Sequence, residues 1–339
     1  MIRYIHPVFP GVAQGVVDEI YAQIKRDFGR VVEPFVLHSP LPTLLAGGWM
    51  VCREAELVGT VSRNVKEAVA AAVSMLNRCP YCVDAHTIML ASTGDYAVAD
   101  AISSSCYWRI RDAKLRSIVD WALATGMPGR GGDGSSPFSP EEAPEIIGTA
   151  VFYHYISRLA TVLLGATPLP SSRSWLRSPL KHVAGLMFRG AVQRPKNAGE
   201  SLRFLPDAAG SKEPEWAKAN PFVAQAFARF AEAIEEAGES ALPSDVRGLV
   251  SGFVGKWSGE TLGIGNYWVE VETRKLEEAS KSAAQLALLA ALAPHQIDEE
   301  IILRFRRHFA EDYFLLGALA WASFKAAQKI GGWIQPKWI

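Results

Sequence analysis

Residues 65–92 read VKEAVAAAVSMLNRCPYCVDAHTIMLAS, and this stretch decides the fold. Its first part has apolar residues at positions 65, 69, 72, 73 and 76, which share one face of a helix over residues 65–77. Pro80 fits the first turn of a second helix over residues 80–92, and Gly94 suits the end of that helix. The stretch therefore predicts two consecutive helices that form an antiparallel hairpin around Asn77 and Arg78.

Helical patterns continue through most of the chain, whereas the apolar–polar alternation typical of strands is nearly absent. We therefore expect an all-α protein. Two stretches rich in Gly, Pro and Ser, residues 126–140 and 166–179, are predicted to be loops. Further helices are expected at residues 12–28, 41–57, 96–104, 112–124, 140–164, 221–237, 244–256, 264–292, 297–309 and 311–330.

An internal repeat is visible when the chain is compared with itself at an offset of 181 residues. Pro40 then falls on Pro221 and Val65 on Val246, and further apolar positions follow. The match extends beyond a single helix, so we interpret it as a tandem duplication. The predicted units are residues 1–190 and 215–339, joined by a polar, proline-broken linker at residues 191–214.

The composition excludes several classes of protein. Lys and Arg number 35 and Asp and Glu also number 35, so the neutral chain has no basic surface for nucleic acid or an anionic membrane. The longest fully apolar run, residues 286–294, is shorter than the ~20 residues of a membrane span. No secretory signal is recognisable, and four cysteines are too few for a disulfide scaffold. We expect a cytoplasmic protein.

Four residues of the first unit carry the chemistry: Glu67, Cys79, Cys82 and His86. Cys79 and Cys82 lie three residues apart at the start of a helix, where a disulfide can close and where the helix dipole favours a thiolate. His86 lies one turn beyond Cys82 on the same face and can accept its proton. Glu67 lies on the preceding helix and can orient the imidazole, which gives a nucleophile, a base and an orienting acid.

Other interpretations of the same residues stay open. A zinc ion has Cys79, Cys82 and His86 as possible ligands, with Glu67 as a fourth, although no second CxxC follows. The cysteines can also be buried structural thiols, as we expect for Cys52. The CPYC sequence matches the glutaredoxin active site, but that fold needs a strand before the CxxC helix. No nucleotide-binding or catalytic metal motif occurs, so no cofactor is expected.

The pattern Glu-x11-Cys-x2-Cys-x3-His on two consecutive helices resembles the alkyl hydroperoxidase D (AhpD)-like branch of the carboxymuconolactone decarboxylase superfamily. The resemblance implies an all-α, AhpD-like helical fold and a thiol-dependent peroxidase or disulfide reductase that forms homo-oligomers. Cys82 corresponds to the attacking cysteine and Cys79 to the resolving one, while His86 and Glu67 correspond to the proton relay. Tyr81 departs from the family, because the peroxidase proper has a histidine at this position.

The resemblance also implies the partners. The substrate would be a hydroperoxide or a protein disulfide, and the reductant a dithiol of lipoyl or thioredoxin type. A lactone decarboxylase or isomerase on the same scaffold, and a redox-sensing or zinc-binding interaction protein, are the alternatives. The second unit is a degenerate copy, because at the same offset the four chemical residues fall on Gly248, Glu260, Gly263 and Tyr267.

Overall fold

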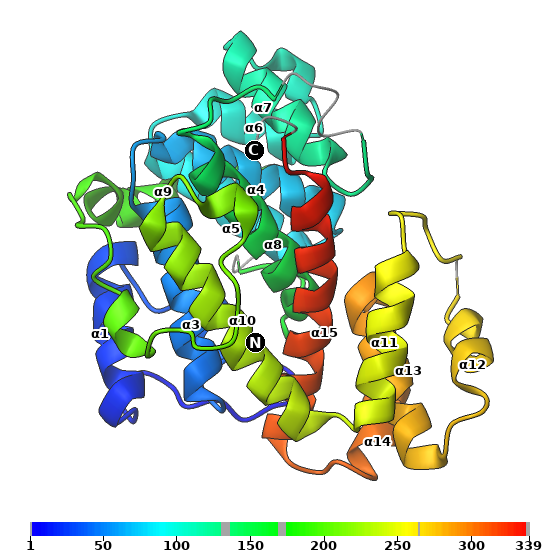
Figure 1. The fold of residues 1–339 in the computed structure, drawn as a ribbon. Helices are drawn as coiled ribbons and strands as arrows, with labels where there is room; N and C mark the ends of the chain where they lie inside the picture. The colour runs from blue at the N-terminus through cyan, green and yellow to red at the C-terminus, as the bar shows by residue number, and fades with distance from the viewer. Residues whose placement is uncertain (1, 130–135, 169–173, 264, 337–339) are drawn as a thin grey trace.

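The protein is all-helical, as the sequence predicted (Figure 1). The computed structural model describes residues 2–129, 136–168, 174–263 and 265–336, and within these residues no strand forms. Among the described residues, one isolated β-bridge, between Ile2 and Leu164, joins the start of the chain to the end of a long helix. The α-helices of the first half are α1 (Gly15–Phe28), α2 (Glu33–Val36), α3 (Pro42–Cys52), α4 (Arg63–Leu76), α5 (Pro80–Ser92), α6 (Tyr96–Ser103), α7 (Ala113–Ala124), α8 (Ala143–Leu163) and α9 (Ser174–Gln193).

The second half consists of α10 (Pro221–Ala241), α11 (Ser244–Lys256), α12 (Tyr267–Thr273), α13 (Glu278–Leu292), α14 (Glu299–Arg306) and α15 (Asp312–Trp333). A π-helical turn, η1 (Arg53–Leu57), continues α3. Short 3₁₀ turns lie at Tyr107–Arg109, Leu202–Phe204, Glu215–Ala217 and Pro294–Gln296.

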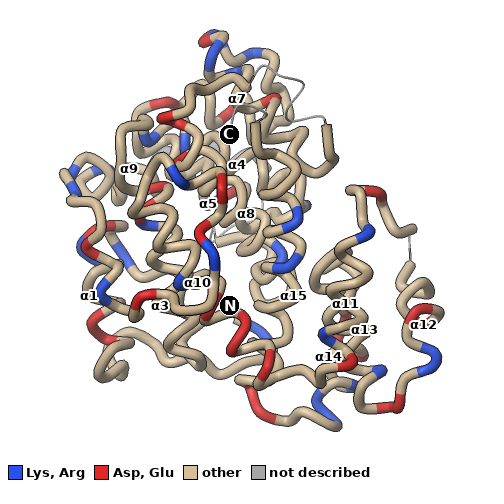
Figure 2. Tube along the Cα trace, in the orientation of Figure 1, with Lys and Arg blue, Asp and Glu red and all other residues tan. Residues whose placement is uncertain are grey.

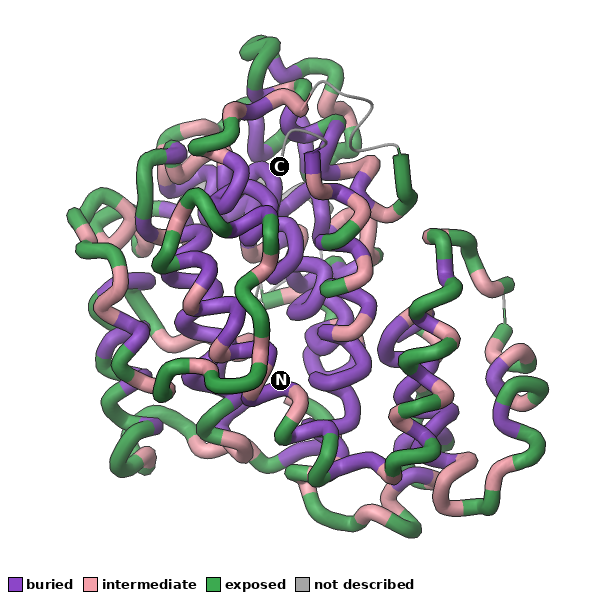
Figure 3. Tube along the Cα trace, in the orientation of Figure 1, coloured by how far each residue is buried: buried purple, intermediate pink, exposed green. Residues whose placement is uncertain are grey.

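The core runs through both halves. Buried apolar residues form one cluster that extends from Ile5 to Ile334. In this core α10 packs along α3, and α15 packs along both α8 and α10 (Figure 1). Buried positions are concentrated on these helices and on α4 and α5 (Figure 3). The second half therefore supplies much of the apolar surface that buries the first.

Helix α8 is long and apolar enough to cross a membrane, but 94% of its most apolar stretch is buried inside the protein. It is the core helix of the first half. Basic and acidic residues are interspersed along the chain (Figure 2). This mixture agrees with the zero formal charge of the sequence.

One pair of helices has corresponding bounds at the offset found in the sequence. The offset of 181 residues places α4 (Arg63–Leu76) on α11 (Ser244–Lys256). Part of the predicted linker is fastened to the first half, because Glu54 accepts hydrogen bonds from the Gly199 backbone at 2.8 Å and the Ser201 hydroxyl at 2.6 Å. The duplication and the domain boundaries stay predictions.

Two expectations were wrong. The helix expected over residues 264–292 is divided, because α12 ends at Thr273 and folds back on α13, where Gln285 donates to the Thr273 hydroxyl at 3.2 Å. The second expected loop, over residues 166–179, is partly helical, because α9 begins at Ser174. Residues 169–173 of this loop and residues 130–135 of the first expected loop lie outside the described residues. Gly185 lets α9 approach the α5 backbone at Ser92 closely. In both places tertiary packing, rather than local helix propensity, determines the secondary structure.

A buried ion pair fixes α4 against α8. Lys66 donates to Glu145 at 2.7 Å, and both side chains are buried. The Glu145 carboxylate also accepts the backbone N–H groups of Thr60 and Val61, at 2.9 and 3.1 Å. Gly59, with φ +109°, makes this approach possible, since a Cβ there would overlap the carboxylate. The loop before α4 is thereby held in one conformation.

Candidate active site

The predicted hairpin brings α4 and α5 together, and its turn lies at Asn77 and Arg78 as expected. Arg78 adopts a left-handed conformation with φ +55°, which reverses the chain. Cys79 then caps α5: its sulfur accepts the backbone N–H of Cys82 at 3.3 Å, and Pro80 follows in the first turn. The local sequence therefore sets the start of the CxxC helix.

Cys79 and Cys82 form a disulfide, with their Cα atoms 5.4 Å apart. Both residues are buried. Cys82 lines a cavity, whereas Cys79 is not among the residues that line it. Of the two cysteines, Cys82 is thus the one that forms part of the cavity wall.

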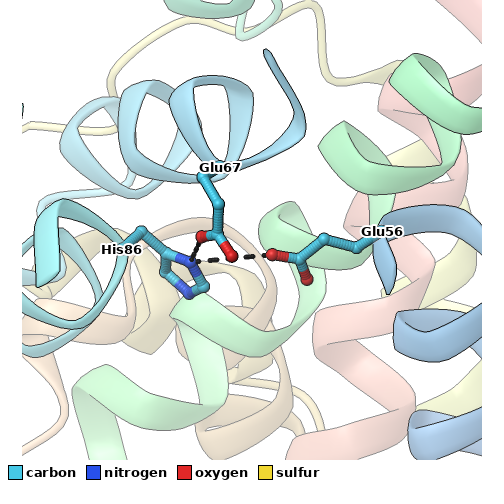
Figure 4. A group of neighbouring side chains, drawn as sticks. All are labelled: Glu56, Glu67 and His86. Carbon is cyan, nitrogen blue, oxygen red and sulfur yellow. Dashed lines mark hydrogen bonds and ion pairs between the residues drawn. The ribbon is translucent and has the colours of Figure 1, made fainter. Parts of the chain in front are cut away.

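Glu67 and His86 meet across the hairpin (Figure 4). Nδ1 of His86 lies 2.7 Å from Oε2 of Glu67, so the hydrogen of the neutral ring is on Nδ1. Arg63 binds the other oxygen of Glu67 through Nε, also at 2.7 Å. Burial by itself would raise the pKa of Glu67, but Arg63 and the bond from His86 outweigh it and the pKa lies below its usual value. Glu67 is therefore a buried carboxylate that orients the imidazole.

The cavity has a volume of about 250 Å³ and is enclosed mainly by apolar side chains. His86 and Cys82, one helical turn apart on α5, both line it. Nε2 of His86 makes no hydrogen bond with the described part of the chain, and the residue forms part of the cavity wall. The apolar wall is formed by residues of α1, α2, α5, α8 and α9, including Phe28, Phe35, Ile88, Met89, Phe152, Ile156 and Phe188.

Tyr81, which replaces the family histidine, also lines this cavity. Its hydroxyl donates to Glu33 of α2 at 2.7 Å. The side chain therefore ties the first turn of α5 to α2.

Sequence reasoning missed two residues beside His86. Tyr153 of α8 packs its ring edge-on to the imidazole, with centroids 4.3 Å apart, and its hydroxyl donates to Glu56 at 2.7 Å. Glu56 comes from the π-helical turn and lies 3.8 Å from Nδ1 of His86. Cys52 is buried as expected, but it also lines the cavity and donates to Glu56 at 3.3 Å. In the sequence, only the acid-rich stretch REAEL at residues 53–57 indicates a further carboxylate near the site.

The residues whose ligand atoms lie together differ from the zinc ligands that the sequence left open as an alternative. Among the described residues, the potential ligand atoms that lie within 4.8 Å of one another belong to Glu56, Glu67 and His86. Arg63 already binds Glu67 and lies 3.8 Å from Glu56, so it supplies the positive charge at this place. Cys79 and Cys82 are bonded to each other. We therefore assign no metal site to either group.

Comparison with known proteins agrees with this architecture. The model of the carboxymuconolactone decarboxylase family matches residues 44–96, which include the hairpin and all four predicted residues. Alkyl hydroperoxide reductase Rv2159c of Mycobacterium tuberculosis is 39% identical over 333 residues, covering 98% of this chain and 95% of that protein. The chain therefore belongs to the AhpD-like branch of the carboxymuconolactone decarboxylase superfamily.

A solved structure was also found. It is described as an alkylhydroperoxidase AhpD core, an uncharacterized peroxidase-related protein from Ralstonia eutropha JMP134. It covers 55% of this chain and 96% of its own, with 18% identity and a TM-score of 0.45.

Proposed function

We propose that this chain is a thiol-dependent peroxidase in which Cys82 attacks a hydroperoxide and Cys79 resolves the product. One observation carries the proposal: Cys82 and His86 line the same apolar cavity, and Glu67 holds the imidazole at 2.7 Å. The name of the mycobacterial relative, an alkyl hydroperoxide reductase, supports the same chemistry.

The first step forms a thiolate and breaks the O–O bond. Nε2 of His86 takes the proton of the Cys82 thiol, and Glu67 stabilises the imidazolium from the other side of the ring. The thiolate attacks the distal oxygen of the hydroperoxide, and the leaving alkoxide takes the proton back from His86 as an alcohol. Cys82 is thereby oxidised to a sulfenic acid.

The second step closes the disulfide. The Cys79 thiol attacks the sulfur of the sulfenic acid, the S–S bond forms and water leaves. An external dithiol then reduces the disulfide by thiol exchange; we propose a lipoyl or thioredoxin-type dithiol in a reducing, cytoplasmic compartment. A partner's disulfide would be attacked by the same Cys82 thiolate. We further propose that the protein acts as a homo-oligomer.

The proposal is tested by titrating the reduced protein with cumene hydroperoxide while counting thiols. We expect rapid loss of two thiols per chain, mapped to Cys79 and Cys82 by mass spectrometry. Cys106→Ser is the matched control, since Cys106 is a free cysteine that does not line the cavity. Cys82→Ser should abolish peroxide-dependent oxidation of an added dithiol; unchanged turnover in this variant would refute the proposal. A lactone decarboxylase would keep its activity without both cysteines.

A further inference from the structure

Glu56 is a buried acid beside the site that the steps above do not use. Its side chain is 1% exposed. One oxygen, Oε2, accepts hydrogen bonds from the Tyr153 hydroxyl at 2.7 Å and from the Cys52 thiol at 3.3 Å. The other oxygen, Oε1, has no hydrogen-bond partner within the described part of the chain. A buried oxygen without a partner is unfavourable, so its position needs an explanation.

The unpartnered oxygen points toward the relay. Oε1 of Glu56 lies 3.8 Å from Nδ1 of His86, the same nitrogen that Glu67 binds at 2.7 Å. Figure 4 shows the two carboxyl groups converging on the ring from different elements, η1 and α4. Tyr153 and Cys52 hold Oε2, and Oε1 lies between His86 and Arg63, whose Nη2 is also 3.8 Å away.

Two carboxylates and one guanidinium lie beside the His86 ring. Glu56 and Glu67 together oppose the single guanidinium of Arg63, which leaves a negative charge that an imidazolium neutralises. The ammonium of Lys66 is bound to Glu145. The titratable and charged groups that face Glu56 are Cys52 of α3, Arg63, Lys66 and Glu67 of α4, His86 of α5 and Tyr153 of α8.

The two carboxyl groups are not equivalent. Burial raises the pKa of Glu56 and the neighbouring Glu67 raises it further, although Arg63 and His86 act in the other direction. The pKa of Glu67 is instead lowered, as described above. As the pH falls, Glu56 is therefore protonated before Glu67.

We propose that Glu56 is a positioning residue of the relay: held by Tyr153, its carboxylate stabilises the His86 imidazolium and so sets the pH range in which Cys82 is a thiolate. This inference rests on the proposed function, because it needs proton transfer from Cys82 to His86. The step breaks the S–H bond and forms an N–H bond at Nε2, and no electrons are exchanged. When Glu56 is protonated, the imidazolium loses this support.

The test is the pH dependence of Cys82 alkylation by iodoacetamide in the reduced protein, with the site mapped by mass spectrometry. Glu56→Gln keeps an amide oxygen for Tyr153 and Cys52 but removes the charge. An opposite charge within ~4–6 Å typically shifts a pKa by about one unit or more, so the midpoint should move about one unit higher. Below the midpoint, alkylation should be about tenfold slower. Glu236→Gln, an exposed position in α10, should keep the original profile.

A Glu56→Gln profile that coincides with the wild-type profile overturns the inference, even if the variant is less stable. Should that variant fail to fold, Glu56→Asp carries the test: the shorter side chain withdraws the charge from Nδ1, so we expect a smaller shift in the same direction, and no shift overturns the inference. Alkylation needs no peroxide. A shifted profile in a protein that does not reduce cumene hydroperoxide would therefore refute the proposed function and support this inference.

Discussion

Glu67→Gln gives the sharpest test of the relay. The substitution keeps the size of the side chain but removes the carboxylate that lies 2.7 Å from Nδ1 of His86. A hydrogen bond to a charged group contributes about 1.5–3 kcal/mol. Without the hydrogen bond to Glu67 the imidazolium is less stable by this amount. Because ~1.4 kcal/mol corresponds to a factor of ten, the reaction of Cys82 with peroxide should slow by about 10-fold to about 100-fold.

The assay is a single turnover of the reduced protein with cumene hydroperoxide, followed by stopped-flow tryptophan fluorescence. The variant will also be less stable, because Glu67 is buried and is the ion-pair partner of the partly buried Arg63. Glu145→Gln is the matched control: it breaks a similarly buried pair, with Lys66, away from the cavity. We expect it to lower the melting temperature without changing the rate. A folded Glu67→Gln protein that reacts within twofold of wild type would disprove the relay.

Three further outcomes are expected. Cys79→Ser should leave Cys82 as a sulfenic acid that excess peroxide converts to the sulfinic acid, with a mass increase on Cys82 and no disulfide; a disulfide involving another cysteine would contradict the assignment. Gly59→Ala should lower the melting temperature by several degrees in circular dichroism, because φ is +109° and a Cβ meets the Glu145 carboxylate. The lowered pKa of Glu67 means that its stabilising contribution is present above its unfolded value of ~4.3 and is lost as the pH falls through its folded value. The difference in melting temperature between wild type and Glu67→Gln should therefore narrow below about pH 4 in a pH series, and a constant difference would show that Glu67 does not titrate as described.

The fold was predictable wherever the signals were local. The apolar stripe and Pro80 place α4 and α5 almost at their observed ends, and α11 begins and ends where its pattern predicts. The division between α12 and α13 carries no glycine or proline to mark it. It arises because the two helices pack against each other, a contact that a single-helix pattern does not encode.

The same distinction between local sequence signals and tertiary packing applies to the candidate site. The offsets among Glu67, Cys79, Cys82 and His86 span only two helices, so the sequence determined that Cys79 and Cys82 would pair at the start of α5 and that Glu67 would meet His86 across the hairpin. The positions of Glu56 and Tyr153 depend on η1 and α8, whose residues 56 and 153 are far apart in the chain. Only tertiary packing brings them to the imidazole and encloses the cavity, because contacts between distant helices depend on how the whole core fills its volume.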